Sequence, residues 1–86
     1  MKKTNKTSTY VITAKNGNQY QWTFTECEPD RDDYGNGIYI HVKMPSGDTT
    51  LIDCRYISLY EFNITCVDYL NSYYGSNLIK LEVINQ

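Results

Sequence analysis

Residues 58–75, SLYEFNITCVDYLNSYYG, are the stretch that decides the fold. On a helical wheel their apolar side chains fall within one arc, which predicts an amphipathic helix of about four turns. The arc comprises Leu59, Phe62, Cys66, Leu70 and Tyr73, with Val67, Tyr69 and Tyr74 on its shoulders. Because a helix with one apolar face must pack against another element, the strands on either side of it should form a sheet.

Both ends of this helix are marked by particular residues. Ser58 and Glu61 have the spacing of a capping box, in which each side chain bonds the backbone amide of the other residue. Gly75 follows the last apolar residues, where a left-handed C-cap favours a residue without a β-carbon. Ile64 falls on the polar side of the wheel, so we expect it to be exposed.

Two hairpins are expected before the helix, and the first joins residues 10–14 to residues 20–25 around Asn16-Gly17-Asn18. We favour a register with Ile12 opposite Trp22 and Asn18 in a left-handed conformation, because it places six apolar side chains on one face. These six are Tyr10, Ile12, Ala14, Tyr20, Trp22 and Phe24, and the other face carries Thr9, Val11, Thr13, Gln21, Thr23 and Thr25.

The second hairpin joins residues 38–44 to residues 49–56 through a turn at Pro45-Ser46-Gly47-Asp48. A loop of residues 46–48 sets Ile40 opposite Cys54 and His41 opposite Asp53. A loop one residue shorter would bury the Asp53 carboxylate opposite Ile40 at a high desolvation cost, so we favour the longer loop.

Residues 77–84 predict a final strand, with Ile79, Leu81 and Val83 facing inward and Lys80 and Glu82 facing outward. The element order ββββαβ predicts an α+β two-layer sandwich, in which one helix covers one face of a five-stranded, mainly antiparallel sheet. We favour pairing the last strand with the first, because it keeps the whole sheet antiparallel, in the order 5-1-2-3-4. The alternative is a right-handed parallel crossover to the fourth strand.

Length and charge narrow the class of protein. The 86 residues suffice for one core, so we expect a flexible basic arm at residues 1–8 and a single α+β domain at residues 9–86. A net charge of −2 gives no general attraction to nucleic acid or anionic membrane. No apolar run could span a bilayer or act as a signal peptide, and the three cysteines are odd in number. Reduced thiols and a cytoplasmic location are therefore expected.

The sequence offers little support for catalysis. His41 beside Asp53 would lack a neighbouring activated nucleophile, and the spacings typical of zinc sites and of phosphate-binding loops are missing. Residues 26–37 form an acidic loop whose Asp30, Asp32 and Gly35 resemble the start of a calcium loop, but Tyr34 and His41 occupy ligand positions. We therefore expect no enzyme activity, no cofactor and no metal, and a merely solvated acidic loop is the simplest alternative.

The function that we predict is a non-enzymatic protein-interaction module. Clustered carboxylates would steer it toward a basic, nucleic-acid-binding partner, and tyrosines would supply contact area. A phage- or mobile-element-encoded inhibitor of a host nucleic-acid-processing or defence protein would work in this way. The predicted partner-binding residues are Glu26, Glu28, Asp30, Asp32, Asp33, Tyr34, Tyr39, His41 and Arg55. The alternative is a nucleic-acid-binding regulator that uses the open sheet face and the basic arm, and a homodimer also remains open.

Overall fold

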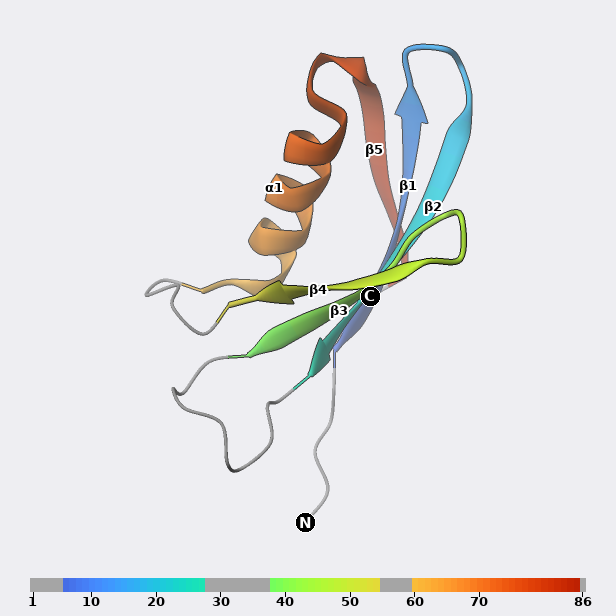
Figure 1. The fold of residues 1–86 in the computed structure, drawn as a ribbon. Helices are drawn as coiled ribbons and strands as arrows, with labels where there is room; N and C mark the ends of the chain where they lie inside the picture. The colour runs from blue at the N-terminus through green and yellow to red at the C-terminus, as the bar shows by residue number, and fades with distance from the viewer. Residues whose placement is uncertain (1–5, 28–37, 55–59, 86) are drawn as a thin grey trace.

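The computed structural model describes residues 6–27, 38–54 and 60–85, which form an open five-stranded sheet with one helix (Figure 1). All strand pairings are antiparallel, in the order β4-β3-β2-β1-β5. The predicted α+β class and strand order are confirmed, and the parallel crossover is wrong. The elements are β1 (Thr7–Ala14), β2 (Gln19–Cys27), β3 (Tyr39–Lys43), β4 (Thr49–Asp53), α1 (Phe62–Tyr74), the 3₁₀ turn η1 (Gly75–Asn77) and β5 (Leu78–Asn85).

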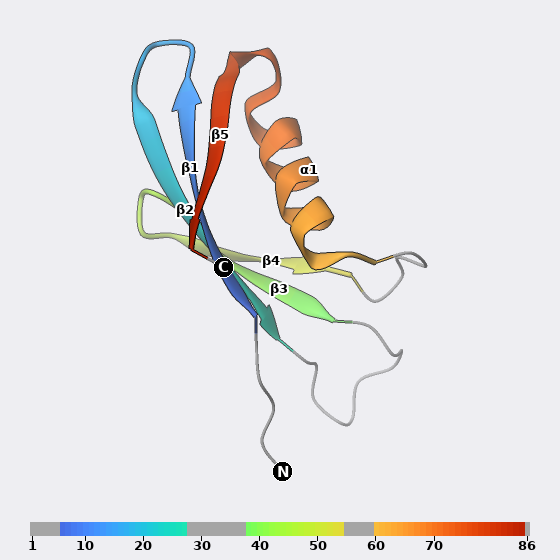
Figure 2. The ribbon, with the colours of Figure 1, turned by 180° about the vertical axis from the view of Figure 1, so that it is seen from behind.

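The sheet is strongly twisted, so that β3 and β4 cross the direction of β1, β2 and β5 (Figures 1 and 2). The helix runs along the β5 side of one sheet face, and its side chains reach across to β2. The ring of Tyr69, for example, lies 6.1 Å from that of Phe24 and 6.0 Å from that of Trp22. One face of the sheet is therefore covered by α1 and the other is open.

The core lies between α1 and the covered face. As predicted, the even-numbered side chains of β1 and β3 are buried, and so are Phe62, Cys66 and Leu70 of the helical stripe. The buried apolar residues are Tyr10, Ile12, Ala14, Trp22, Phe24, Ile40, Val42, Cys54, Phe62, Cys66 and Leu70. Leu59 lies outside the described residues. Tyr73 was expected in the core but is 56% exposed, because the last helical turn lies at the margin of the core against Trp22.

Each hairpin is closed by a three-residue loop, and the two loops have the same conformation. In both hairpins each residue therefore pairs with a residue two positions away from its predicted partner. Gly17 N donates to Ala14 O, and Gly17 has a φ of 89°. The second loop repeats this pattern, with Gly47 N donating to Met44 O and a φ of 99°. This is a type I turn followed by a glycine in the left-handed region. Glycine, not Asn18, therefore takes the left-handed position.

The observed pairs are Ile12 with Tyr20 in the first hairpin and Ile40 with Ile52 in the second. The predicted pairs Ile12–Trp22 and Ile40–Cys54 are wrong. Because an error of two residues preserves the alternation of side chains, the predicted faces are nevertheless correct.

The helix begins later than its capping box predicts. Its N-cap is Glu61, in an extended conformation and without a side-chain capping bond, and Phe62 is the first helical residue. Glu61 is therefore not at the third helical position, and Ser58 lies outside the described residues. At the other end Gly75 has a positive φ of 57°, as expected, although its ψ of −132° differs from that of a left-handed helix.

The strand β5 departs most from the prediction. Its register with β1 shifts at two places and leaves Ile79 and Ile84 as the extra residues. Leu78 and Leu81 pack against the core, and Val83 lies opposite the buried Tyr10, on the predicted face, although it is 40% exposed. Ile79, predicted to face inward, is an extra residue and is 61% exposed. The bulges rotate the strand out of strict alternation. Lys80 and Glu82 face outward as predicted.

Candidate functional site

Two of the predicted partner-binding residues, Tyr39 and His41, lie on the open face of β3. His41 is opposite Leu51 of β4, and Tyr39 is opposite Asp53 in the next row. The predicted pairing of His41 with Asp53 is therefore wrong. Leu51 is 57% exposed although it is apolar. We refer to Tyr39, His41 and Leu51 as the open-face patch.

The predicted acidic loop begins later than expected, because β2 continues to Cys27. Glu26 is a half-buried strand residue on the helix side, and its Oε2 accepts a 2.8 Å hydrogen bond from Tyr60 Oη. Burial, the bond to Glu26 and its negative charge all raise the pKa of Tyr60 well above 10. The side chain of Glu26 is thus held against Tyr60 instead of projecting from a loop. The remaining predicted residues, Glu28, Asp30, Asp32, Asp33, Tyr34 and Arg55, lie outside the described residues.

The segment that carries these carboxylates is nevertheless anchored beside the patch. Cys27, the last residue of β2, is opposite Tyr39, the first residue of β3. Residues 28–37 therefore leave and rejoin the sheet at the row of Tyr39, one row from His41. The sequence between Cys27 and Tyr39, which carries these carboxylates, therefore connects two strand ends that lie next to the open-face patch.

The described residues assemble no nucleophilic or metal centre. Cys54 and Cys66 are buried free thiols. Burial raises the pKa of both, that of Cys66 to about 12, so they remain protonated at neutral pH and are weak nucleophiles. No group of three or more His, Cys, Asp or Glu side chains in the described segments is placed to hold a metal ion. Within the same segments no helix has the length and apolar character needed to cross a membrane.

A second surface, which the sequence did not predict, is an aromatic cleft of about 860 Å³ on the helix side of the sheet. It lies where the last turn of α1 meets the two hairpin loops. Its lining residues are Ala14, Lys15, Asn16, Tyr20, Trp22, Met44, Pro45, Ser46, Tyr73, Tyr74 and Asn77. Aromatic rings form its walls, and lysine, serine and asparagine side chains form a polar rim.

The walls of the aromatic cleft are fixed by contacts between the rings. Tyr20 and Tyr74 are stacked with centroids 6.0 Å apart, and the Tyr73 ring lies 4.8 Å from the Trp22 ring. Trp22 is buried, and its Nε1 donates a 2.8 Å hydrogen bond to Tyr74 Oη. The indole therefore holds the Tyr74 ring in place at the base of the aromatic cleft. The backbone bond from Lys15 N to Asn77 O, at 2.7 Å, joins the first hairpin loop to the end of η1.

The adjacent residues Tyr73 and Tyr74 are the part of the sequence that could have indicated the aromatic cleft. Two adjacent tyrosines at the end of an amphipathic helix cannot both face its buried stripe. One of them should therefore lie at the edge of the core. What the sequence could not supply was the position of the hairpin loops above that edge, since this depends on the twist of the sheet.

Comparison with known proteins assigns no family. No protein-family model matches the chain, and no curated protein or solved structure is significantly similar to it. Function must therefore be inferred from the chemistry of the open-face patch and the aromatic cleft.

Proposed function

We propose that this chain is a non-catalytic interaction module that binds another protein through the open-face patch. The observation that carries the proposal is Leu51, which is 57% exposed and lies opposite His41 in the row next to Tyr39. An exposed apolar side chain beside a phenol and an imidazole suits a contact that loses water on binding. The open face offers such a partner the outward side chains of neighbouring strands.

The negative charge of residues 28–37 favours a partner that is basic. Residues 28–37 contain four carboxylates and one arginine, and they follow Cys27, which lies opposite Tyr39. Such a charge would accelerate the encounter with a positively charged protein and would favour it over acidic ones. We therefore propose a basic, nucleic-acid-binding protein as the partner, which is inhibited when its groove is occupied. A phage or mobile element as source and the cytoplasm as location belong to the same proposal, and the free buried thiols are compatible with a reducing compartment.

The aromatic cleft offers a second contact surface for the same function. Protein interfaces concentrate binding energy in Tyr and Trp side chains surrounded by polar residues that exclude water. Tyr73 and Tyr74 inside a rim of Lys15, Asn16 and Ser46 have this arrangement. A partner's apolar side chain would be seated in the aromatic cleft, whereas the open-face patch would receive a flatter surface.

The test compares two matched substitutions. Leu51 and Ile64 are 57% and 58% exposed, and Ile64 lies on the solvent side of α1. The partner is first captured from the host on immobilised wild-type protein and purified. Leu51→Asp should then weaken its binding at least tenfold, whereas Ile64→Asp should leave it unchanged. Tyr73→Ala tests the aromatic cleft in the same assay. If Leu51→Asp binds like the wild type, the open-face patch is not the interface.

The charge argument has its own measurement. Replacing Asp30, Asp32 and Asp33 together by asparagine should lower the association rate constant of the purified partner at low salt and should change its dissociation rate little. An unchanged association rate would exclude the steering role.

Nucleic acid binding is the outcome that would replace this proposal. Fluorescence anisotropy with labelled random single-stranded DNA at low salt should show no binding. Tight binding that declines steeply with salt and is weakened by Lys43→Ala on the open face would favour a nucleic-acid-binding regulator instead.

A further inference from the structure

The outer edge of β5 is an exposed apolar strand edge. The strand pairs with β1 on one side, and within the described residues no strand lies on its other side. Its exposed side chains include Ile79, Val83 and Ile84. An eight-residue edge of this kind without proline is a ready template for another strand.

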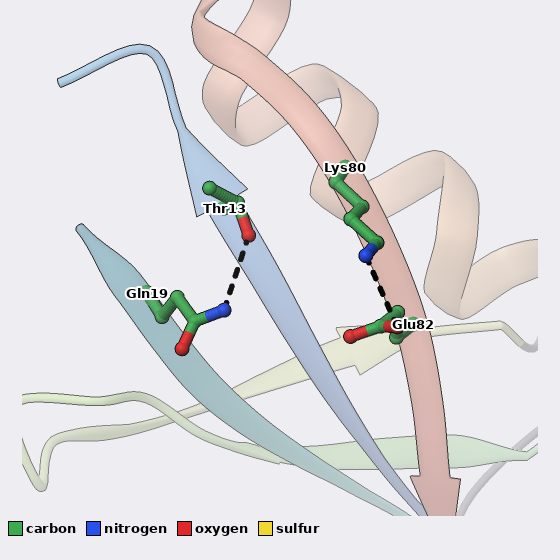
Figure 3. Close-up of polar contacts among 4 residues, drawn as sticks. All are labelled: Thr13, Gln19, Lys80 and Glu82. Atoms are coloured by element: carbon green, nitrogen blue, oxygen red, sulfur yellow. Dashed lines mark hydrogen bonds and ion pairs between the residues drawn. The ribbon is translucent and has the colours of Figure 1, made fainter. Parts of the chain in front are cut away.

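The charges on this edge are arranged symmetrically about one residue. Lys80 and Glu82 flank Leu81, face away from the helix and form an ion pair of 3.4 Å within the strand (Figure 3). When two copies of a strand pair antiparallel about Leu81, Lys80 of each lies opposite Glu82 of the other. The same register sets Leu81 opposite Leu81 and Ile79 opposite Val83.

Neighbouring registers lack this complementarity. A two-fold axis at Glu82 would place two carboxylates opposite each other, and one at Lys80 would place two ammonium groups opposite each other. Registers that lie between these centres set charged residues opposite apolar ones. Since like charges in directly opposed positions are unfavourable, only the register centred on Leu81 satisfies both the charges and the apolar residues.

We propose that two copies of this chain associate through antiparallel pairing of β5 with β5, centred on Leu81. The occupant of the edge is thus a second copy, selected by the charge complementarity of residues 80–82. The two-fold axis of adjacent antiparallel strands is perpendicular to the sheet, so both helices lie on the same side of a continuous ten-stranded sheet. Because this contact is isologous, it closes at two subunits and does not extend into a fibre.

The experiment exchanges the charges. Sedimentation over a range of concentrations should show the wild type approaching twice its chain mass of 10.0 kDa. Lys80→Glu alone and Glu82→Lys alone should each be monomeric, because each creates two like-charge pairs across the axis. An equimolar mixture of the two single variants should recover the dimer, since every pair is then of opposite charge. The double variant should recover it as well.

The controls separate this contact from loss of folding and from other interfaces. Circular dichroism should show that each charge variant remains folded, which the exposure of both side chains favours. Ile79→Lys should abolish the dimer, whereas Ile64→Lys, at similar exposure on α1, should not. A wild type that is monomeric at every concentration would overturn the proposal. So would a dimer that resists both single charge variants, or one that only Leu51→Asp dissociates.

Discussion

The indole nitrogen of Trp22 donates a hydrogen bond of 2.8 Å to the hydroxyl oxygen of Tyr74. This bond joins the second strand to the last turn of the helix at the base of the aromatic cleft. Trp22 is buried, so its N–H group is shielded from water and depends on a protein acceptor. The geometry of the aromatic cleft and the packing of the helix therefore depend on the same bond.

Removing this acceptor should destabilise the fold. Tyr74→Phe leaves the buried Trp22 donor unsatisfied, and the free energy of unfolding should fall by about 1–3 kcal/mol. Tyr73→Phe is the matched control, because Tyr73 is 56% exposed and its ring would remain against Trp22, so its effect should stay below about 0.5 kcal/mol. Guanidinium denaturation followed by tryptophan fluorescence measures both. Equal effects would contradict the role of the bond.

Leu70 tests which side of the helix carries the core. It is fully buried, and Leu70→Ala should lower the free energy of unfolding by about 2–5 kcal/mol through lost contacts and a residual cavity. Ile64→Ala, on the exposed side, should change it by less than about 1 kcal/mol. Urea denaturation distinguishes the two, and a larger effect at Ile64 would show that the helix faces the sheet differently.

Alkaline pH should weaken the fold through Cys66. Burial, followed by the charge of Cys54, raises the pKa of the Cys66 thiol from 9.0 to about 12. Above pH 9 the unfolded chain loses this proton while the folded chain keeps it. The contribution of this thiol to the free energy of unfolding should therefore be constant well below pH 9 and then fall, by at most about 1.4 kcal/mol per pH unit.

The pH effect is measured as a slope between pH 9 and 10, to which the raised pKa of Cys54 also contributes, as does that of Tyr60 when the unfolded tyrosine begins to ionise near pH 10. Cys66→Ala should make the slope shallower, and the part that remains belongs to Cys54 and the buried tyrosines. Leu70→Ala should lower stability at every pH with the slope retained, because it removes no titrating group. A Cys66→Ala slope equal to that of the wild type would exclude the thiol as its cause.

The first hairpin loop should require glycine. Gly17 has a φ of 89°, so Gly17→Ala should destabilise the fold by about 1–2 kcal/mol through backbone strain, although nothing blocks an added β-carbon there. Gly17→Asn should cost less, because asparagine tolerates positive φ better. Thermal unfolding of the two variants should rank them in this order. An alanine variant as stable as the wild type would mean that the loop adopts another turn.

Alternation of side chains predicted the sheet faces but left the registers undetermined. A burial pattern with a period of two cannot distinguish registers that differ by two residues. The turns decide between them: Asn18 N donates to Asn16 Oδ1, and Asp48 N bonds Ser46 Oγ in the same relative position. Placing Gly17 and Gly47 at the third position of a three-residue loop would have given the observed register in both hairpins.

Other differences depend on tertiary structure. The helical stripe predicted that Phe62, Cys66 and Leu70 are buried, but Tyr73 has the same periodicity and lies where the sheet no longer covers the helix. The two bulges of β5 fall at the apolar pairs Leu78-Ile79 and Val83-Ile84, which interrupt the alternation, but such a pair does not by itself identify the extra residue. The aromatic cleft needed both the twist of the sheet and the position of the helix end, neither of which follows from local pattern.

The pairing of β1 with β5 also sets the sequence of events during synthesis. The two hairpins contain only local contacts and can form as soon as each emerges from the ribosome. Strand β1, by contrast, is hydrogen-bonded to β5, so in a nascent polypeptide this edge of β1 stays unpaired until β5 has also been synthesised. Long-range closure of this kind is slow, and the interval before it is the period in which chaperone binding and misassembly would compete with the native fold.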